Sequence, residues 1–508
     1  MQSASDRNFY STAFTPSDLS SAYKGPQDSI TSRVTQYLPP ITTLPTLKAD
    51  APSNTLNFQI PNADGCIDSK TIRLHLNIQV TVAGGNYTQG WVRLDNAGWG
   101  AMISQINLLE GGALVEQVTD AGVLQAMLNQ QVPEDYQESI LAVTEGTNYV
   151  EEELPYIPSA VAEDNPDLPL RAGSFKNLIG PVGRPGGKYL ILFSPAADLT
   201  AAARGSVTLN TSTSINLPLG FFNTYRPIHS YMLNSMRLKV IFNPIKSFLV
   251  WPTGHGSVTN TTVAISNAEL RYDLLSLSTE FRSNMLDVVR ELGSFEYPFD
   301  TYRLSENFLT TSLNQTIKIS ASGGSLLQHI TFGFIESSSV TTDRPSMSYF
   351  EAMGLKSFYF KIGGLRVPSH NINVQQLSVG GAVIKFATQY DTPALVYTED
   401  NADGFIETIK SQGLYKSYAI GQKGNSGTLI RGPYAGSDES GERRLYSYSF
   451  TQSYDQEALS GFVLGDNSEI SLVLEFWKAP VASTRCIIAL NYGMKHVFLA
   501  SGQTITQG

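Results

Sequence analysis

The stretch MRLKVIFNP at residues 236–244 returns as ISLVLEFWKAP at residues 470–480, and this pair decides the fold. In each copy four apolar side chains alternate with other residues, and a proline follows nearby. These apolar positions are Met236, Leu238, Val240 and Phe242, then Ile470, Leu472, Leu474 and Phe476. A period of two is typical of a β-strand that buries one of its faces. We therefore expect Leu238 and Leu472 to occupy equivalent core positions in two related units.

Two further pairs of stretches extend this repeat. INLLEGGALVEQ from Ile106 resembles FKIGGLRVPSHN from Phe360, because each reads as a strand that runs into a Gly-Gly turn and back. AELRYDLL from Ala268 matches IALNYGM from Ile488 in its alternating apolar positions. The spacing between partners falls from 254 to 234 to 220 residues, as it would if the first copy had the longer loops. Two copies of one β-sandwich domain explain these matches.

Short strands dominate the rest of the chain. TIRLHLNIQVTV at residues 71–82 alternates without a break, with His75 on the opposite face from Leu74 and Leu76. Similar runs predict strands at residues 103–109, 189–193, 268–274, 316–319, 330–335, 358–362 and 382–386. Helical spacing predicts short helices after Thr119 or Asp120, after Asp403, and over residues 281–292. Because strands and helices do not alternate, the pattern favours antiparallel sandwiches over a doubly wound sheet.

Charged residues are scarce in this sequence. They make up 16% of the 508 residues, against a typical value of about 25%, and the net charge is −10. Stable interfaces are depleted in Asp, Glu and Lys, so this composition favours assembly into an oligomer. No cluster of Lys and Arg is present to neutralise phosphates, so we expect no sequence-specific binding of nucleic acid. We also expect neither a transmembrane helix nor a secretory signal, since no apolar run approaches 18 residues.

The repeated sandwiches resemble the double jelly-roll major capsid proteins. That lineage contains adenovirus hexon, the tectivirus coat, the large icosahedral DNA viruses of eukaryotes and the virophages. The resemblance is carried by LPLGFFNTYRPIHSYMLNSMRLKVIFNP at residues 217–244, AISNAELRYDLL at residues 264–275, and the paired region at residues 446–492. It covers nearly the whole chain after residue 54, and the length and the proline-rich N-terminal segment are most similar to virophage capsid proteins.

This resemblance implies a structural function. A homotrimer of pseudo-hexagonal outline would form the capsomers of an icosahedral double-stranded DNA virus, in the virion shell and, during assembly, in the host cell. Its partners would be neighbouring capsomers, penton proteins and minor capsid proteins, and an internal membrane beneath the shell stays an open question. The alternative from another class is a two-domain carbohydrate-binding or glycoside-processing β-sandwich protein. A spike or penton protein, usually built on one jelly roll, is disfavoured by the repeat.

We therefore predict an all-β chain of two consecutive eight-stranded antiparallel jelly rolls, a double jelly roll, with a few short helices. Residues 1–53, which show neither strand nor helix periodicity, are expected to form an extended N-terminal arm. The first jelly roll, with long loop insertions, is assigned to residues 54–285, and the second, with a short C-terminal tail, to residues 286–508. The tail, SGQTITQG at residues 501–508, is either a natural stop or a terminus left by proteolytic processing.

We assign no catalytic, cofactor-binding or metal site, and we expect no cofactor and no enzymatic activity. The glycine-rich run at residues 180–190 lacks the GK[ST] ending of a phosphate-binding loop, so we interpret it as a loop that enters a strand. Cys66 and Cys486 are expected to be reduced thiols on strands. An acidic stretch is interpreted as a solvated insertion loop, and it holds Glu145, Glu151, Glu152, Glu153, Glu163, Asp164 and Asp167. The histidines show no spacing that predicts a metal site, and they are His75, His229, His255, His329, His370 and His496.

Overall fold

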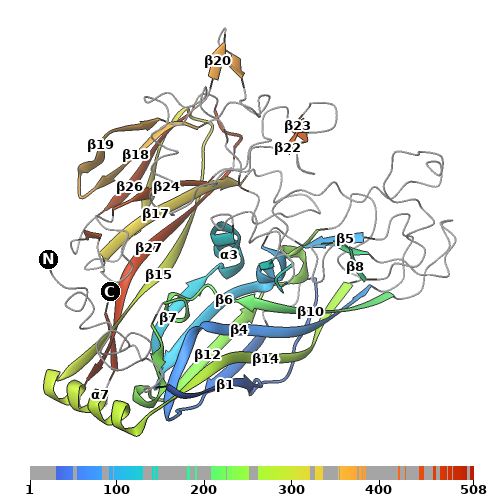
Figure 1. Ribbon diagram of the computed structural model, residues 1–508. Helices are drawn as coiled ribbons and strands as arrows, with labels where there is room; N and C mark the ends of the chain where they lie inside the picture. The colour runs from blue at the N-terminus through green and yellow to red at the C-terminus, as the bar shows by residue number, and fades with distance from the viewer. Residues whose placement is uncertain are drawn as a thin grey trace.

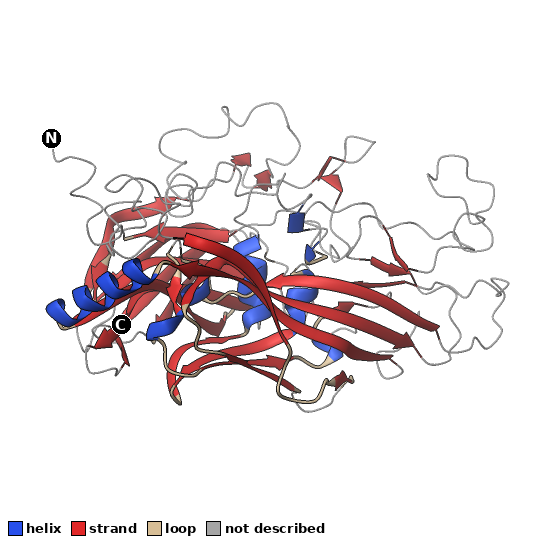
Figure 2. Cartoon of the chain, turned by 60° about the horizontal axis from the view of Figure 1, so that its bottom comes forward, coloured by secondary structure: helices blue, strands red, loops and turns tan. Residues whose placement is uncertain are grey.

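The fold is taken from a computed structural model of the chain, shown in Figures 1 and 2. It describes residues 30–49, 54–82, 91–94, 97–129, 140–141, 144–146, 180–182, 189–191, 207–224, 226–250, 261–320, 326–335, 350, 353, 355–373, 377–379, 382–384, 422–423, 429–430, 445–450, 461–464, 469–476, 479–482, 484–499 and 504–507. Strands dominate these residues, and helices form only short segments among them (Figure 2). The predicted all-β class is confirmed.

The first jelly roll consists of two antiparallel sheets. One sheet has the order β1-β14-β4-β10, with two short strands, β2 and β11, at its margins. These strands are β1 (Ile30–Leu38), β2 (Thr46–Leu47), β4 (Gly65–Val82), β10 (Val207–Asn216), β11 (Ile228–His229) and β14 (Thr261–Leu277). The facing sheet has the order β3-β12-β6-β7. Its strands are β3 (Thr55–Ile60), β6 (Ile103–Glu110), β7 (Ala113–Thr119) and β12 (Met236–Phe242).

The eight main strands of the second jelly roll repeat this topology in the same order along the chain. Its first sheet has the order β15-β27-β17-β24, with β25 and β28 at its margins, and its second has the order β16-β26-β18-β19. The first sheet contains β15 (Ser294–Phe308), β17 (Leu326–Ile335), β24 (Leu445–Ser449), β25 (Phe462–Val463), β27 (Arg485–Leu499) and β28 (Thr504–Gln507). The second contains β16 (Asn314–Ile319), β18 (Leu355–Ile362), β19 (Leu365–Asn373) and β26 (Ile470–Phe476). The predicted pair of eight-stranded jelly rolls is therefore confirmed.

Smaller elements fill the connections between these strands. A further sheet has the order β13-β5-β9-β8, and two hairpins are β20–β21 and β22–β23. The strands are β5 (Trp91–Leu94), β8 (Gly180–Val182), β9 (Tyr189–Ile191), β13 (Leu249–Val250), β20 (Leu377–Val379), β21 (Ala382–Ile384), β22 (Gln422–Lys423) and β23 (Leu429–Ile430). The 3-10 turns are η3 (Gly98–Met102), η5 (Gly220–Phe222), η6 (Ser230–Met232) and η7 (Ile245–Ser247). Within the described ranges, no helix has the length and apolar character needed to cross a membrane.

The predicted equivalence of Leu238 and Leu472 is confirmed by strand register. Leu238 on β12 lies between Phe58 of β3 and Leu108 of β6. Leu472 on β26 lies in the same way between Ile317 of β16 and Phe360 of β18. Both leucine side chains are fully buried, so the alternating apolar pattern in both stretches marks the inner face of a central strand.

Matching Gly-Gly turns also link the two copies. The hairpin β6–β7 turns at Gly111 and Gly112, whose φ angles are 54° and 92°, and β18–β19 turns at Gly363 and Gly364, with φ angles of 56° and 85°. Two-residue hairpins require positive φ at both central positions, which glycine adopts without steric cost. The predicted strand, turn and strand are thus confirmed in both halves.

Two of the three predicted helices lie in the described residues. The helix predicted after Asp120 is α3 (Ala121–Asn129), and the helix predicted at residues 281–292 is α7 (Thr279–Leu292). α7 begins where the Ser278 hydroxyl accepts a hydrogen bond from the Phe281 amide, and it ends at Gly293, which has a φ angle of 77°. It connects β14 of the first jelly roll to β15 of the second (Figure 1). The helix predicted after Asp403 lies outside the described residues.

The hydrophobic residues form two cores, and β27 takes part in both. Cys486, Ile488 and Leu490 point into the core of the second jelly roll. The residues between them, Ile487 and Ala489, pack into the core that belongs mainly to the first. Because successive side chains of a strand point to opposite faces, a strand that is buried along its whole length has a core on each side. The second jelly roll therefore shares one face of its first sheet with the first jelly roll.

The sequence predicts no strand before residue 54, and this prediction is wrong. β1 pairs with β14 along eight residues, so it belongs to the first sheet of the first jelly roll. Its side chains are held by polar contacts rather than by apolar burial, which explains the missing periodicity: Val34 is 49% exposed and Tyr37 is 59% exposed. Residues 1–29 lie outside the described residues, so the N-terminal arm stays a prediction for that segment.

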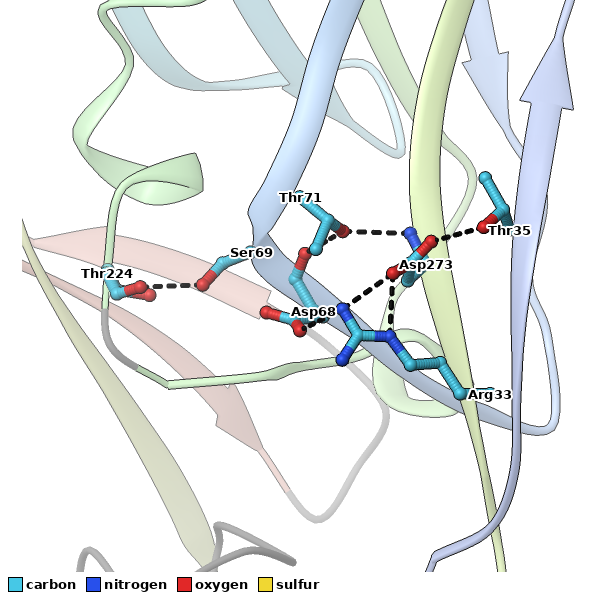
Figure 3. Close-up of polar contacts among 7 residues, drawn as sticks. All are labelled: Arg33, Thr35, Asp68, Ser69, Thr71, Thr224 and Asp273. Carbon is cyan, nitrogen blue, oxygen red and sulfur yellow. Dashed lines mark hydrogen bonds and ion pairs between the residues drawn. The ribbon is translucent and has the colours of Figure 1, made fainter. Parts of the chain in front are cut away.

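Arg33 provides the main polar attachment of β1 (Figure 3). Its guanidinium reaches Asp273 of β14 at 2.6 Å and Asp68 of β4 at 3.2 Å. The other oxygen of Asp273 accepts a hydrogen bond from Thr35, and the Asp273 amide donates to the Thr71 hydroxyl. Burial raises the pKa of Asp273, but hydrogen bonds from Thr35 and Arg33 and the Arg33 charge outweigh it and hold the pKa below its usual range. The carboxylate therefore stays ionised and keeps its hold on β1 near neutral pH.

We expect Arg33→Ala to loosen β1 without unfolding the chain. Arg33 is 55% exposed, and ion pairs of exposed residues contribute about 1 kcal/mol or less. Hydrogen exchange should therefore speed up for the amides of β1 while the midpoint of thermal unfolding changes little. Arg290→Ala, which removes an exposed ion pair with Asp287 on α7, is the matched control. Unchanged exchange in β1 would show that backbone pairing alone retains the strand.

Candidate functional site: the junction between the jelly rolls

The two jelly rolls meet at a ribbon formed by β15 and β27. These two strands run together past β7 of the first jelly roll towards α7 (Figure 1). The described residues that make the contact are here called the junction, and they are Glu110, Glu116, Gly220, Phe221, Tyr297, Phe299, Asp300, Thr301 and His496. No catalytic residue is assigned in this chain. We therefore treat the junction as the candidate functional site, because it holds the two jelly rolls in one relative orientation.

Phe221 of η5 is the apolar centre of the junction. Its ring centroid lies 5.0 Å from that of Tyr297, 5.4 Å from that of Phe299 and 5.6 Å from that of His496. Phe221 is fully buried although it belongs to the first jelly roll and these three partners belong to the second. Tilted and edge-to-face rings at such distances are a favourable arrangement for aromatic side chains.

Gly220 allows η5 to touch β15 directly. A Cβ atom at this position would lie 1.3 Å from the carbonyl oxygen of Asp300, which belongs to the β15 backbone. Neither backbone can move away without opening the aromatic cluster around Phe221. Position 220 is thus restricted to glycine by the close approach of the two jelly rolls.

Glu116 joins the same two elements through hydrogen bonds. Its carboxylate, on β7, accepts from the amides of Gly220 and Phe221 at 2.9 and 3.0 Å and from the Thr301 hydroxyl at 2.8 Å. Burial raises the pKa of Glu116, and although these three hydrogen bonds oppose that shift, the pKa remains at about 7. One carboxyl group therefore holds η5 and β15 together, and its charge changes near neutral pH.

Glu110 and His496 form a second buried polar contact across the junction. Oε2 of Glu110, at the end of β6, lies 2.6 Å from Nε2 of His496 on β27, and both side chains are almost completely buried. Oε1 of Glu110 accepts a hydrogen bond from the Asn234 amide at 2.7 Å. Burial raises the pKa of Glu110, but hydrogen bonds from His496, Asn234 and Thr504 outweigh it, so the pKa lies below its ordinary value.

The prediction of a solvated acidic loop is wrong for Glu145. This residue is fully buried in the first jelly roll, where its carboxylate accepts from the Asn216 amide at 2.9 Å and from the Gln125 amide group at 3.2 Å. Burial, only partly offset by these contacts, raises its pKa to about 7. The other six carboxylates of the predicted loop lie outside the described residues.

The remaining sequence candidates are not gathered into one place. Cys66 and Cys486 are buried free thiols on strands, as predicted. His75 lies on the outer face of β4 beside Ser214, as predicted, and burial lowers its pKa to about 4. No group of three metal-ligating side chains occurs in the part of the chain that the structure describes. His255 and residues 183–188 of the glycine-rich run lie outside that part.

Glu110 and Glu116 were missed by sequence reasoning, although the repeat contains a signal for Glu110. Glu110 precedes Gly111 in the first hairpin, and Ile362 precedes Gly363 at the corresponding point of the second. Both side chains are buried. A carboxylate at a position where the other copy has a core isoleucine indicates a buried partner that can hydrogen-bond to it. That partner, His496, is 386 positions away in the chain, so no local pattern could identify it.

We expect Glu116→Gln to change how stability depends on pH. The folded-state pKa of Glu116 is about 7, above the usual value of 4.5, so the contribution of this group to stability is full below pH 4.5 and is lost as the pH rises through 7. The loss amounts to about 3 kcal/mol at most. Glutamine has no such loss, so the destabilisation by Glu116→Gln in urea unfolding should be larger at pH 5 than at pH 7.5. Equal destabilisation at both values would contradict the raised pKa; Glu145→Gln should show the same trend.

Comparison with solved structures places this architecture among viral proteins. A chain in the cryo-EM structure of the Sputnik virophage aligns with a TM-score of 0.55 and 11% identity, over 94% of this chain and 89% of that chain. The Faustovirus major capsid protein aligns with a TM-score of 0.53 and 10% identity, over 92% and 90%. The mavirus major capsid protein aligns with a TM-score of 0.51 and 10% identity, over 93% and 90%. No family model and no curated protein matches the sequence. The resemblance to double jelly-roll capsid proteins is confirmed at the level of the fold.

Proposed function

We propose that this chain is the major capsid protein of an icosahedral double-stranded DNA virus. Three copies would associate into a capsomer of pseudo-hexagonal outline that carries six jelly rolls and tiles the virion shell. The observation that carries this proposal is the pair of topologically identical jelly rolls joined by a buried junction. A shell tile needs two such units that keep a fixed relative orientation, and a junction with an aromatic centre and buried carboxylates provides this.

Composition supports a role in assembly. The whole chain has 45 acidic and 35 basic residues, only 16% of its length, and interfaces between stable partners are depleted in Asp, Glu and Lys. The partners we propose are two further copies of the chain, then neighbouring capsomers, penton proteins and minor capsid proteins. We propose no enzymatic activity and no sequence-specific contact with nucleic acid. Nothing in the described residues favours the carbohydrate-binding alternative.

The division of the chain follows the sheets in this proposal. The first unit would span residues 30–277 and the second residues 294–507, with α7 as the link between them. This division moves the start of the first unit from residue 54 to the beginning of β1, because β1 is an edge strand of its sheet. It also places the last strand, β28, within the second unit.

Size-exclusion chromatography with light scattering tests the proposed trimer. The expected mass is three times the 55.4 kDa of one chain, since obligate oligomers bury interfaces larger than about 2,000 Å² and stay associated on dilution. Negative-stain images of the same fraction should show six-sided particles. A stable monomer at micromolar concentration would contradict the capsomer.

A further inference from the structure

The C-terminal strand β28 lies on the edge of β27, directly beside the junction. β28 pairs antiparallel with residues 495–498 of β27, and the opposite edge of the same residues pairs with β15. The sequence predicts a short polar tail here, and residues 504–507 of this tail form a strand. The segment that precedes it, residues 500–503, is only four residues long.

The side chains of β28 alternate between the junction and solvent. The Thr506 hydroxyl lies 3.0 Å from Nδ1 of His496, and the Thr504 side chain lies near enough to Glu110 to help lower the pKa of that carboxyl. Ile505, between the two, is 44% exposed. The two threonines of β28 thus lie at alternate positions beside the Glu110–His496 pair. On the other side of this pair, the Asn234 amide donates to Glu110. The rings of Phe221 and Phe498 pack against His496.

A threonine hydroxyl suits this place because it can donate or accept a hydrogen bond. Nδ1 of His496 accepts from Thr506 in the tautomer that carries its proton on Nε2, and it donates to the same oxygen in the tautomer that carries its proton on Nδ1. A valine of similar shape would leave Nδ1 and one lone pair of Glu110 without these partners, and a buried polar group that loses its partner costs about 1–3 kcal/mol. The contact therefore selects for hydroxyl side chains rather than for size.

We propose that the edge of β27 at residues 495–498 is a strand-binding site for an extended segment with hydroxyl side chains at two alternate positions. Its occupant in this chain is residues 504–507. Backbone pairing provides affinity and the two alternate side chains provide specificity, as in other cases where a peptide adds a strand to a sheet. Because the bound strand covers Glu110 and His496, which come from different jelly rolls, its binding is coupled to the closure of the junction.

β28 binds at this edge intramolecularly, because it belongs to the same chain as β27. A short connection gives an effective concentration in the millimolar range, so a free peptide at micromolar concentration cannot displace it. If β28 cannot pair, the site becomes free for the same sequence supplied from outside. The site can then be measured as an ordinary binding reaction.

The test uses the full chain with the double substitution Ile505→Pro and Thr506→Pro. In an antiparallel pair, one of two successive amides points to the partner strand, so at least one proline removes a ladder hydrogen bond. The probe is a fluorescent peptide of residues 501–508, and the reference probe carries valine at both threonine positions. We expect the double-proline chain to bind the first peptide, to bind the valine peptide at least tenfold more weakly, and the unaltered chain to bind neither at micromolar concentration.

Three results would overturn the proposal: no binding to a double-proline chain that keeps its circular dichroism spectrum, equal binding of both peptides, or equal binding to the unaltered chain. If the double-proline chain does not fold, hydrogen exchange decides. Thr504→Val with Thr506→Val in the full chain should speed exchange of the residue 495–498 amides at least tenfold. Exchange unchanged by both valines would refute the role of the hydroxyls.

Discussion

Gly220→Ala should be among the most destabilising single substitutions in the chain. The added Cβ would lie 1.3 Å from the Asp300 carbonyl oxygen, so η5 and β15 must separate. Such overpacking costs about 3 kcal/mol or more, because both backbones are fixed by their own hydrogen bonds. The separation also pulls the Gly220 and Phe221 amides away from Glu116. Urea unfolding should show the loss, and the yield of soluble protein should fall.

Gly112→Ala is the matched control for this prediction. It adds the same methyl group at a glycine with no atom near the new Cβ, and its φ of 92° makes the cost one of backbone strain, about 1–2 kcal/mol. The β6–β7 turn should be destabilised, while the amides of the junction should stay protected from hydrogen exchange. If Gly220→Ala costs no more than Gly112→Ala, then the close approach of the two jelly rolls is not the constraint that we describe.

Phe221→Ala should open the junction from its centre. The ring is fully buried and contacts three rings of the second jelly roll, and removing a buried phenylalanine costs about 3–5 kcal/mol. Phe58→Ala removes an equally buried ring from β3, in the interior of the first jelly roll. Both variants should lose similar stability in urea.

The two variants should differ in where protection is lost. Phe221→Ala should speed hydrogen exchange in residues 294–301 of β15, whereas Phe58→Ala should leave those amides protected until global unfolding. If trimers form, Phe221→Ala should also reduce them more strongly, since the two jelly rolls would no longer keep one orientation. Equal exchange in β15 for both variants would contradict the role of Phe221.

Much of the fold can be predicted from the sequence because its central strands bury one face. Leu238 and Leu472 stand in clean alternations, and the Gly-Gly turns mark where each hairpin reverses. β1 could not be predicted in this way, because Arg33 and Thr35 attach it to the carboxylates of Asp273 on β14 and Asp68 on β4. An alternation of apolar residues predicts only strands that bury an apolar face, so it does not predict a strand that is held by polar contacts.

The junction could be predicted only in part. Nothing near Phe221 indicates that its ring meets Tyr297 and Phe299, because that contact depends on how two separate sandwiches pack. The buried carboxylates are harder still. In the sequence, Glu116 and Glu145 look like solvent-exposed residues. Only the folded chain brings to them the amides whose hydrogen bonds offset the free-energy cost of burying a carboxylate.

The pairing of β15 with β27 has a consequence for the order in which the molecule folds during synthesis. Ser294 pairs with Leu499, so β15 leaves the ribosome about 200 residues before its partner strand. At usual rates of translation this interval lasts roughly 10 to 40 s, during which Phe295, Tyr297 and Phe299 have no partner in their own sheet. Phe221 and Glu116 have been made by then, in a first jelly roll whose strands are all complete by residue 277. The folded first jelly roll can therefore bind β15 before β27 is synthesised, and the second jelly roll then folds against it.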